Sequence, residues 1–340
     1  DVKTLNFAVG GYQTAGRGIV EISGESTVVT AQICVASTAY GDGAAVYQRG
    51  GRVVNRLGTD QGITARPLIA YMGSGEWNLF GGSYTSVGTA YWAANQSMLD
   101  AFFMQYGGTS RFEPNGAGNF FAMGCGNGVN ASSLDGGRSH LYVAGGSCMI
   151  TNMTLQVPAN GYRFGYAELV ADGPSSSISL VDVNGRYGLT EGSRTCFTLN
   201  NGGLLEFSDS IYNYSGSIRS EVFFNVNGGR IRSIKKRGLR LGLEEEGRHS
   251  GRITVFEKGI EFDTNDGSDI TVRFPIVKPT GKGVKSIVLK KSASGFMSPV
   301  GAPGLLVSGG GGDGATALAQ FDPETRSVTN VIVTCPGWGY

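Results

Sequence analysis

The sequence predicts an all-β fold: a single-stranded parallel β-helix with coils of about 28 residues, ending in a glycine-rich β repeat. Three observations predict it. A Gly-Gly step recurs with apolar residues on both sides, the segments beside it are short and alternate apolar with polar residues, and Asn-Gly or Asp-Gly pairs separate them. Such recurrence is typical of a solenoid, in which each unit buries its apolar face only against its neighbours.

The Gly-Gly step is the most regular feature, with a mean spacing of about 28 residues when weaker single-glycine copies are included. The pairs are Gly50-Gly51, Gly107-Gly108, Gly145-Gly146, Gly202-Gly203 and Gly228-Gly229, and the weaker copies are Gly24, Gly75, Gly173 and Gly251. Glycine adopts a positive φ without steric cost, so each step predicts a corner between two strands.

The segments beside the corners alternate with period two, as in Leu205-Glu206-Phe207, which favours strands over helices. Stacked coils pair in parallel and in register. We therefore expect Val53, Leu205, Ile231 and Ile253 to point inward and to stack into ladders. The alternative is a β-sandwich with glycine-rich loops, since chance alone places some Gly-Gly pairs in a chain with 56 glycines.

Between residues 84 and 121 the coils lengthen and aromatic residues accumulate, and part of this segment, residues 91–103, can also be read as a helix. Insertions in a solenoid usually lie on one face, which is often the binding face. The candidate ligand-binding residues are Tyr91, Trp92, Phe102, Tyr106 and Phe112. Such a role requires Trp92 and at least two neighbouring rings to be exposed. The alternative is that the rings fill the inside of larger coils.

Charge and repeats divide the chain into a parallel β-helix over residues 1–256, a β-hairpin or connecting segment over 257–283, and a glycine-rich 44-residue repeat over 284–340. Residues 284–296 align without a gap on 328–340, so the last segment holds one full copy and the start of a second. We expect the full-length protein to continue the second copy beyond Tyr340.

The cysteines lack a CxxC pair and a nearby histidine, which predicts buried free thiols and no metal site at them. The one cofactor hypothesis is calcium at Asp263, Asp266 and Asp269. Their order is out of step with an EF-hand loop and lacks its distal glutamate, so a turn joining two strands is the preferred interpretation, with no cofactor.

The overall charge is close to neutral, with a net charge of +1 and 16% charged residues, so the composition gives no case for nucleic acid as a partner. No apolar run reaches the roughly 18 residues that a membrane-spanning helix needs, so we expect no membrane insertion. Aromatic residues outside the stack would suit contacts with sugar rings or peptides, so a glycan or a host or cell-surface protein is among the partners considered.

The C-terminal motif supports a resemblance. The run Ser308–Ala317, the strand Val328–Thr334 and the end Gly337-Trp338-Gly339-Tyr340 resemble a glycine-rich β repeat of large bacterial surface proteins and some phage structural proteins. The Asn-Gly-Gly coils before it are similar to autotransporter passengers and other pectin-lyase-like right-handed β-helices. The resemblance implies a secreted or surface-displayed bacterial structural or adhesin module that binds a glycan or a protein through a solenoid face.

Two other functions remain open: a polysaccharide lyase or glycoside hydrolase of the pectin-lyase-like type, and a segment of a phage fibre or tailspike. His140 and His249 are the only histidines, and most aspartates stand singly beside turn residues, so the sequence assigns no catalytic residue. Acids and bases stacked along a groove would indicate an enzyme, whereas uniform polar ladders would indicate a structural module.

Overall fold

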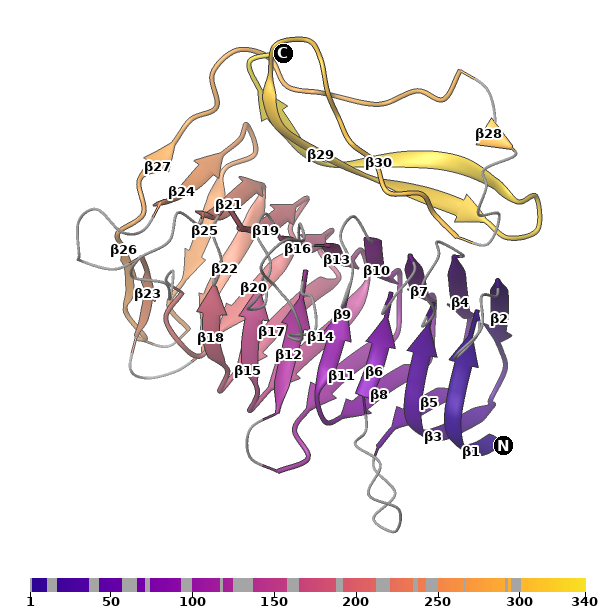
Figure 1. Ribbon diagram of the computed structural model, residues 1–340. Coiled ribbons are helices and arrows are strands. Elements are labelled where there is room, and N and C mark those ends of the chain that lie inside the picture. The colour runs from indigo at the N-terminus through magenta and orange to yellow at the C-terminus, as the bar shows by residue number, and fades with distance from the viewer. Residues whose placement is uncertain are drawn as a thin grey trace.

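The computed structural model describes residues 2–10, 17–36, 43–56, 66–70, 74–92, 100–116, 119–124, 137–157, 165–187, 192–211, 221–234, 238–242, 250–265, 267–290, 293–294 and 301–340. Within these ranges every regular element is a strand, and parallel strands stack into a β-solenoid with coils of about 28 residues (Figure 1). The all-β solenoid predicted from the sequence is therefore confirmed. The described part of the chain holds no helix long and apolar enough to cross a membrane.

One wall of the solenoid is a ten-stranded parallel sheet, here called the covered sheet. Its strands, in spatial order, are β2 (Gly18–Ile22), β4 (Ala44–Gln48), β7 (Gly75–Leu79), β10 (Asp100–Gln105), β13 (Arg138–Val143), β16 (Tyr166–Asp172), β19 (Arg194–Asn200), β21 (Glu221–Asn227), β24 (Ser250–Val255) and β27 (Ile276–Val277).

The opposite wall is a 15-stranded sheet, here called the open sheet, whose two arms meet at the long strand β3 (Thr27–Val35). One arm contains β5 (Arg52–Asn55), β8 (Ser83–Val87), β11 (Thr109–Glu113), β14 (Gly146–Thr151), β17 (Ser176–Val181), β20 (Leu204–Phe207), β22 (Gly229–Ser233) and β25 (Ile260–Asp263). The other contains β6 (Arg66–Ile69), β9 (Ala90–Trp92), β12 (Phe120–Met123), β15 (Thr154–Val157) and β18 (Asn184–Tyr187), and β1 (Val2–Val9) pairs with β3.

Apolar side chains fill the inside of the coils. Val53, Leu205, Ile231 and Ile253 are all 0% exposed, and Leu205 is the register partner of Ile231. The inward ladder predicted from these residues is confirmed, and the parallel pairing excludes the β-sandwich alternative. Inward stacking of this kind lets every coil bury its apolar stripe against the coils on either side.

The longer coils accommodate large rings. Trp92 stacks on Phe103 at a centroid separation of 5.3 Å and meets Phe121 edge-on at 4.8 Å. The helix considered over residues 91–103 is not formed by residues 91–92 and 100–103, which belong to strands β9 and β10. Residues 93–99 lie outside the described residues. Ring packing of this density contributes about 0.5–1.5 kcal/mol per pair beyond area burial.

The glycine corners form a ladder. Gly51, Gly82 and Gly108 have φ near +70 to +78°, and the backbone N–H of Ser83 and of Thr109 donates to the carbonyl of Gly51 and of Gly82 respectively. A Cβ on Gly108 would lie less than 3.0 Å from the Gly82 carbonyl oxygen. Both the φ and the close approach therefore demand glycine.

Two of the weaker corner assignments were wrong. Gly75 begins strand β7, and the corner of that coil is Gly81-Gly82 instead. Gly251 lies inside β24, where a Cβ would enter the Phe274 ring, and the corner follows at Gly259. A single glycine can thus mark close packing against a strand and not a turn.

The strands expected on both sides of the acidic turn are present, but they do not form a hairpin with each other. β25 pairs in parallel with β22, and β26 (Ile270–Val272) pairs in parallel with β23 (Leu239–Leu241). β27 then pairs with β24. This segment therefore continues the solenoid.

The C-terminal segment forms an antiparallel hairpin of β29 (Asp313–Asp322) and β30 (Ser327–Trp338), with the short β28 (Ala293–Ser294) on its edge. The glycine run and the aromatic end of the chain interlock in it, because a Cβ on Gly314 would enter the Trp338 ring and one on Gly312 the Tyr340 ring. Glycine opposite an aromatic residue lets the ring cover the neighbouring backbone. The first copy behaves differently: residues 284–290 contain no strand, and Val284 N–H donates to the Pro336 carbonyl.

The hairpin lies across the outer face of the covered sheet, from β24 to β4 (Figure 1). Its apolar residues form two clusters with that face. One joins Ala317, Phe321 and Val328 to Tyr47, and the other joins Leu318 to Phe102. All six residues of β10 are buried in consequence, whereas β11 of the open sheet alternates between exposed and buried residues.

Candidate functional site

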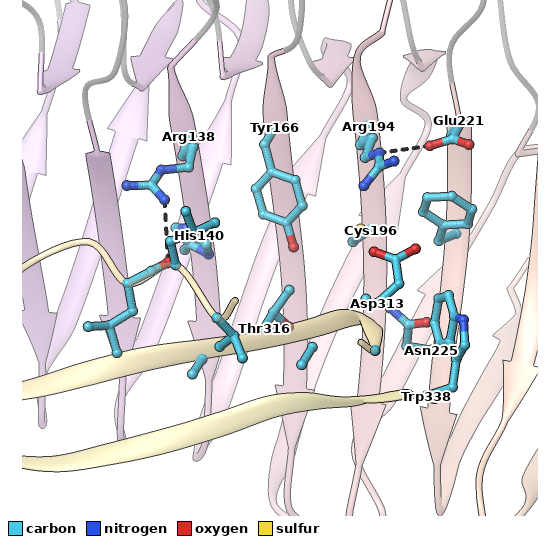
Figure 2. Close-up of a pocket in the computed structure, with 18 of the residues that line it drawn as sticks. Arg138, His140, Tyr166, Arg194, Cys196, Glu221, Asn225, Asp313, Thr316 and Trp338 are labelled. Atoms are coloured by element: carbon cyan, nitrogen blue, oxygen red, sulfur yellow. Dashed lines mark hydrogen bonds and ion pairs between the residues drawn. The ribbon is translucent and has the colours of Figure 1, made fainter. Parts of the chain in front are cut away.

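A pocket of about 320 Å³ lies where the hairpin crosses strands β13 to β24 of the covered sheet (Figure 2). The solenoid forms one wall, and the other comes from the beginning of β29, the end of β30 and residues 305–307. The volume is at the lower end of the range for ligand pockets. Figure 2 shows arginines, carboxylates and the Trp338 ring gathered around it.

The solenoid wall contains Asn225 and two rows of register partners, and Glu168 is the one member of these rows that does not line the pocket. Arg138, Tyr166, Arg194 and Glu221 occupy equivalent positions in four neighbouring strands. The second row lies two residues further along the strands and contains His140, Glu168, Cys196, Phe223 and Arg252. Because side chains alternate between the faces of a strand, both rows face the hairpin.

Two of the three arginines in the pocket have carboxylate partners. Arg138 Nε lies 2.7 Å from Asp100 Oδ1, and its Nη1 donates to the Leu305 carbonyl at 3.3 Å. Arg194 Nε lies 2.7 Å from Glu221 Oε2. The Arg194 side chain is 50% exposed, so this pair contributes at most about 1 kcal/mol to stability. Both pairs fix the position of a guanidinium beside the pocket.

The third arginine, Arg252, is held by rings. Its guanidinium carbon lies 4.8 Å from the Phe223 ring centroid and 4.1 Å from that of Trp338. Phe223 comes from the solenoid and Trp338 from the hairpin, so Arg252 joins the two units through cation–π contacts. Its Nε is buried and has no hydrogen-bond partner among the described residues.

A buried carboxylate anchors the hairpin beside the pocket. Glu168 is 0% exposed, and Thr198 Oγ1 and Thr316 Oγ1 donate to its Oε1 at 3.0 and 3.2 Å. His140 Nδ1 lies 3.2 Å from Oε2, and Thr334 Oγ1 donates to that oxygen at 3.5 Å. Thr316 and Thr334 belong to the hairpin. Burying a charge is costly unless hydrogen bonds satisfy it, so this cluster favours one position of the hairpin.

The nucleophilic groups of the pocket are not activated. Burial raises the pKa of the Cys196 thiol, and the neighbouring Glu168 carboxylate raises that pKa further. Burial likewise holds the pKa of Tyr166 well above its ordinary value, with Cys196 and Glu168 adding to the effect. Thiolate and phenolate are the reactive forms, so neither group is set to act as a nucleophile or base near neutral pH.

The prediction of buried free thiols is confirmed for Cys34, Cys148, Cys196 and Cys335. Cys148 is 0% exposed on the inward position that follows a glycine corner. Cys125 lies outside the described residues. A buried thiol behaves as a small apolar side chain, which is how Cys148 packs here.

The aromatic residues predicted to bind a ligand occupy three different environments. Trp92 and Phe112 are 0% exposed inside the coils, so the expected exposure of Trp92 was wrong, because its ring fills the longer coil. Phe102 and Tyr106 lie on the outer face of the covered sheet, where the hairpin covers them, and Gln320 Nε2 donates to Tyr106 Oη at 3.3 Å. Tyr91 belongs to β9, and its side chain is not among those described. Trp92, Phe102, Tyr106 and Phe112 are not among the residues that line the pocket.

The calcium hypothesis stays a prediction, since Asp266 lies outside the described residues. Asp263 Oδ2 accepts a hydrogen bond from Arg232 Nε at 2.8 Å, and this contact lowers the pKa of Asp263. The described residues contain no cluster of three or more His, Cys, Asp or Glu side chains that is able to hold a metal ion.

The residues of the pocket were not identified from the sequence, although two signals pointed toward it. Trp338 and Tyr340 belong to the repeat motif, and the unalternating run Ala101–Met104 indicates a strand buried on both faces. Comparisons of the chain with protein-family models, with curated proteins and with solved structures gave no match.

Proposed function

We propose that the chain is a structural or adhesive module of a secreted or surface-displayed bacterial protein, similar to autotransporter passengers, and that it binds a glycan in the pocket between solenoid and hairpin. The observation that supports this best is the pocket itself. It combines Trp338 and Tyr340 with Asn225 and Asp313, which supply an apolar wall and polar groups that can hydrogen-bond sugar hydroxyls.

The chemistry of the pocket favours binding over catalysis. Glu221 is engaged by Arg194, the Cys196 thiol and the Tyr166 phenol keep their protons, and Glu168 is committed to the hairpin contact. A glycosidase requires a free pair of carboxyl groups at a defined separation across the scissile bond. A rigid solenoid with a pocket at its covered face serves adhesion without such groups.

A polysaccharide lyase or glycoside hydrolase is the second candidate, and one observation favours it. His140 lines the pocket with Nδ1 3.2 Å from the Glu168 carboxylate, an arrangement that orients an imidazole for proton transfer. Against it, the His140 side chain is only 9% exposed and its ring stacks beneath Phe102 at 5.2 Å. The two candidates are separated by product formation.

The test is a panel of immobilised neutral and acidic polysaccharides, incubated with the purified chain. We expect retention of the chain without new reducing ends or unsaturated products. Trp338→Ala should lose retention, whereas Phe80→Ala, which removes a 40% exposed ring outside the pocket, should keep it. Retention by no glycan, or equal retention of both variants, would refute the proposal, and product formation abolished by His140→Gln would establish the enzymatic alternative.

A further inference from the structure

Arg252 has an arrangement that differs from that of the other pocket arginines. Arg138 and Arg194 each face a carboxylate at 2.7 Å, whereas among the described residues the Arg252 side chain has cation–π contacts with the Phe223 and Trp338 rings and no hydrogen bond or ion pair. Rings stacked on a guanidinium cover its faces and leave the N–H groups at its edge. The position of Arg252 thus comes from stacking, and its hydrogen-bonding edge remains unused.

The unused Nε of Arg252 is one observation that favours a ligand. Arg252 Nε is buried without a partner, and Arg252 lines the pocket. Buried polar groups in native proteins are nearly always hydrogen-bonded, so a buried orphan donor requires an explanation. An acceptor that arrives with a ligand provides one. The best acceptor for the fork of a guanidinium is a carboxylate or another planar or tetrahedral anion, held by two parallel hydrogen bonds.

The rest of the pocket selects among anions. Asp313 of the hairpin lines the same space as Arg252, and Asn225 adds an amide that both donates and accepts. A small inorganic anion would gain from Arg252 but would be repelled by Asp313. A ligand with an anionic group at one end and hydroxyl groups at the other satisfies both, since the hydroxyls can donate to the carboxylate of Asp313. An acidic sugar has this combination.

We infer that the pocket binds the carboxylate of an acidic saccharide, a uronic acid unit, through the edge of the Arg252 guanidinium, with its hydroxyl groups at Asp313 and Asn225. This inference rests on the proposed glycan-binding function and specifies its ligand. The pocket of about 320 Å³ limits the ligand to a short saccharide segment.

The experiment is isothermal titration of the whole chain with short galacturonate oligosaccharides and with galactose oligosaccharides of the same length. We expect the acidic ligand to bind more tightly by about tenfold or more, because a hydrogen bond to a charged group is stronger than one between neutral groups. Arg252→Gln should remove that difference, and Arg252→Lys, which keeps the charge but loses the planar fork, should restore only part of it.

Arg111→Gln is the matched control, since Arg111 lies on the open sheet, pairs with Glu113 and is outside the pocket. It should leave both affinities unchanged. Equal binding of acidic and neutral ligands, or acidic binding that Arg252→Gln does not weaken, would overturn the inference and leave glycan binding standing. Competition by inorganic phosphate at equal concentration would also overturn it, as the site would then be a general anion site. Binding of no saccharide would refute the proposed function as well.

If Arg252→Gln does not fold, Arg252→Lys and Asp313→Asn test the binding of the saccharide carboxylate by Arg252. Removal of the Asp313 carboxylate should weaken saccharide binding while improving that of inorganic phosphate, since the repulsion is gone. An unchanged preference between saccharide and phosphate in Asp313→Asn would contradict the assignment.

Discussion

Glu76 makes the contact between the covered sheet and the segment that precedes the hairpin dependent on pH. It is 3% exposed on β7, and its Oε2 accepts a hydrogen bond from the backbone N–H of Ala302 at 2.7 Å. Burial raises its pKa from 4.5 to about 7, although the Ala302 hydrogen bond opposes the shift. Glu76→Gln keeps an acceptor for Ala302 and removes the titration, so this substitution isolates the cost of the buried charge.

The raised pKa of Glu76 determines the direction and the size of its effect on stability. A carboxyl with a raised pKa binds its proton more tightly in the folded chain, so its contribution is fully present below pH 4.5 and is lost as the pH rises through about 7. At 1.36 kcal/mol for each pKa unit, the loss for a shift from 4.5 to about 7 is about 3 kcal/mol. Wild type and Glu76→Gln should have similar stability at pH 4, and the variant should be more stable at pH 8 by up to this amount.

The assay is urea unfolding of both proteins at intervals from pH 4 to pH 8, with hydrogen exchange at Ala302 as a local readout. Solenoids can unfold in more than one step, so the transition that includes the hairpin is the relevant one. The prediction fails if the stability difference between the two proteins stays constant from pH 4 to pH 8. It also fails if Glu76→Gln becomes less stable than wild type as the pH rises.

Two further predictions concern the coils, and a third concerns the buried thiols. Gly108→Ala should lower the free energy of unfolding by several kcal/mol, because the added Cβ clashes with the Gly82 carbonyl and the left-handed backbone is strained for alanine. Gly24 has a similar φ but open space around it, so Gly24→Ala should cost only the backbone strain, about 1–2 kcal/mol. Equal losses of stability in thermal unfolding would contradict the glycine ladder. Trp92→Phe should lower stability without changing saccharide affinity, and an altered affinity would return Trp92 to the binding site. Cys335, whose pKa burial raises to about 12, and the other described thiols should react with a thiol reagent at pH 8 only after unfolding, and fast labelling of the native chain at Cys335 would contradict its burial.

The solenoid could be predicted because its causes are local and repeated. A positive φ at each corner and period-two alternation at Leu205 and Ile231 act within one coil, and their recurrence reveals the stacking. Single features were less informative, since Gly75 and Gly251 reflect close packing that depends on partners in other coils. The rings at Trp92 and Phe112 were ambiguous for the same reason.

The pocket could not be predicted because it arises from a contact between distant segments. Arg252 and Trp338 meet only when the hairpin lies on the covered sheet, and no local pattern encodes that position. The same holds for Glu168, whose partners Thr316 and Thr334 are far along the chain. Two sequence features did contribute to this contact, namely the glycine run and the aromatic residues Trp338 and Tyr340, which pack together in the hairpin.

The most direct test of saccharide binding in the pocket is a crystal structure of the chain soaked with a galacturonate disaccharide. We predict that the sugar lies between solenoid and hairpin, with its carboxylate on the edge of the Arg252 guanidinium and its hydroxyl groups near Asp313. A saccharide bound on the outer face of the open sheet, or bound in the pocket with its carboxylate turned away from Arg252, would contradict this prediction.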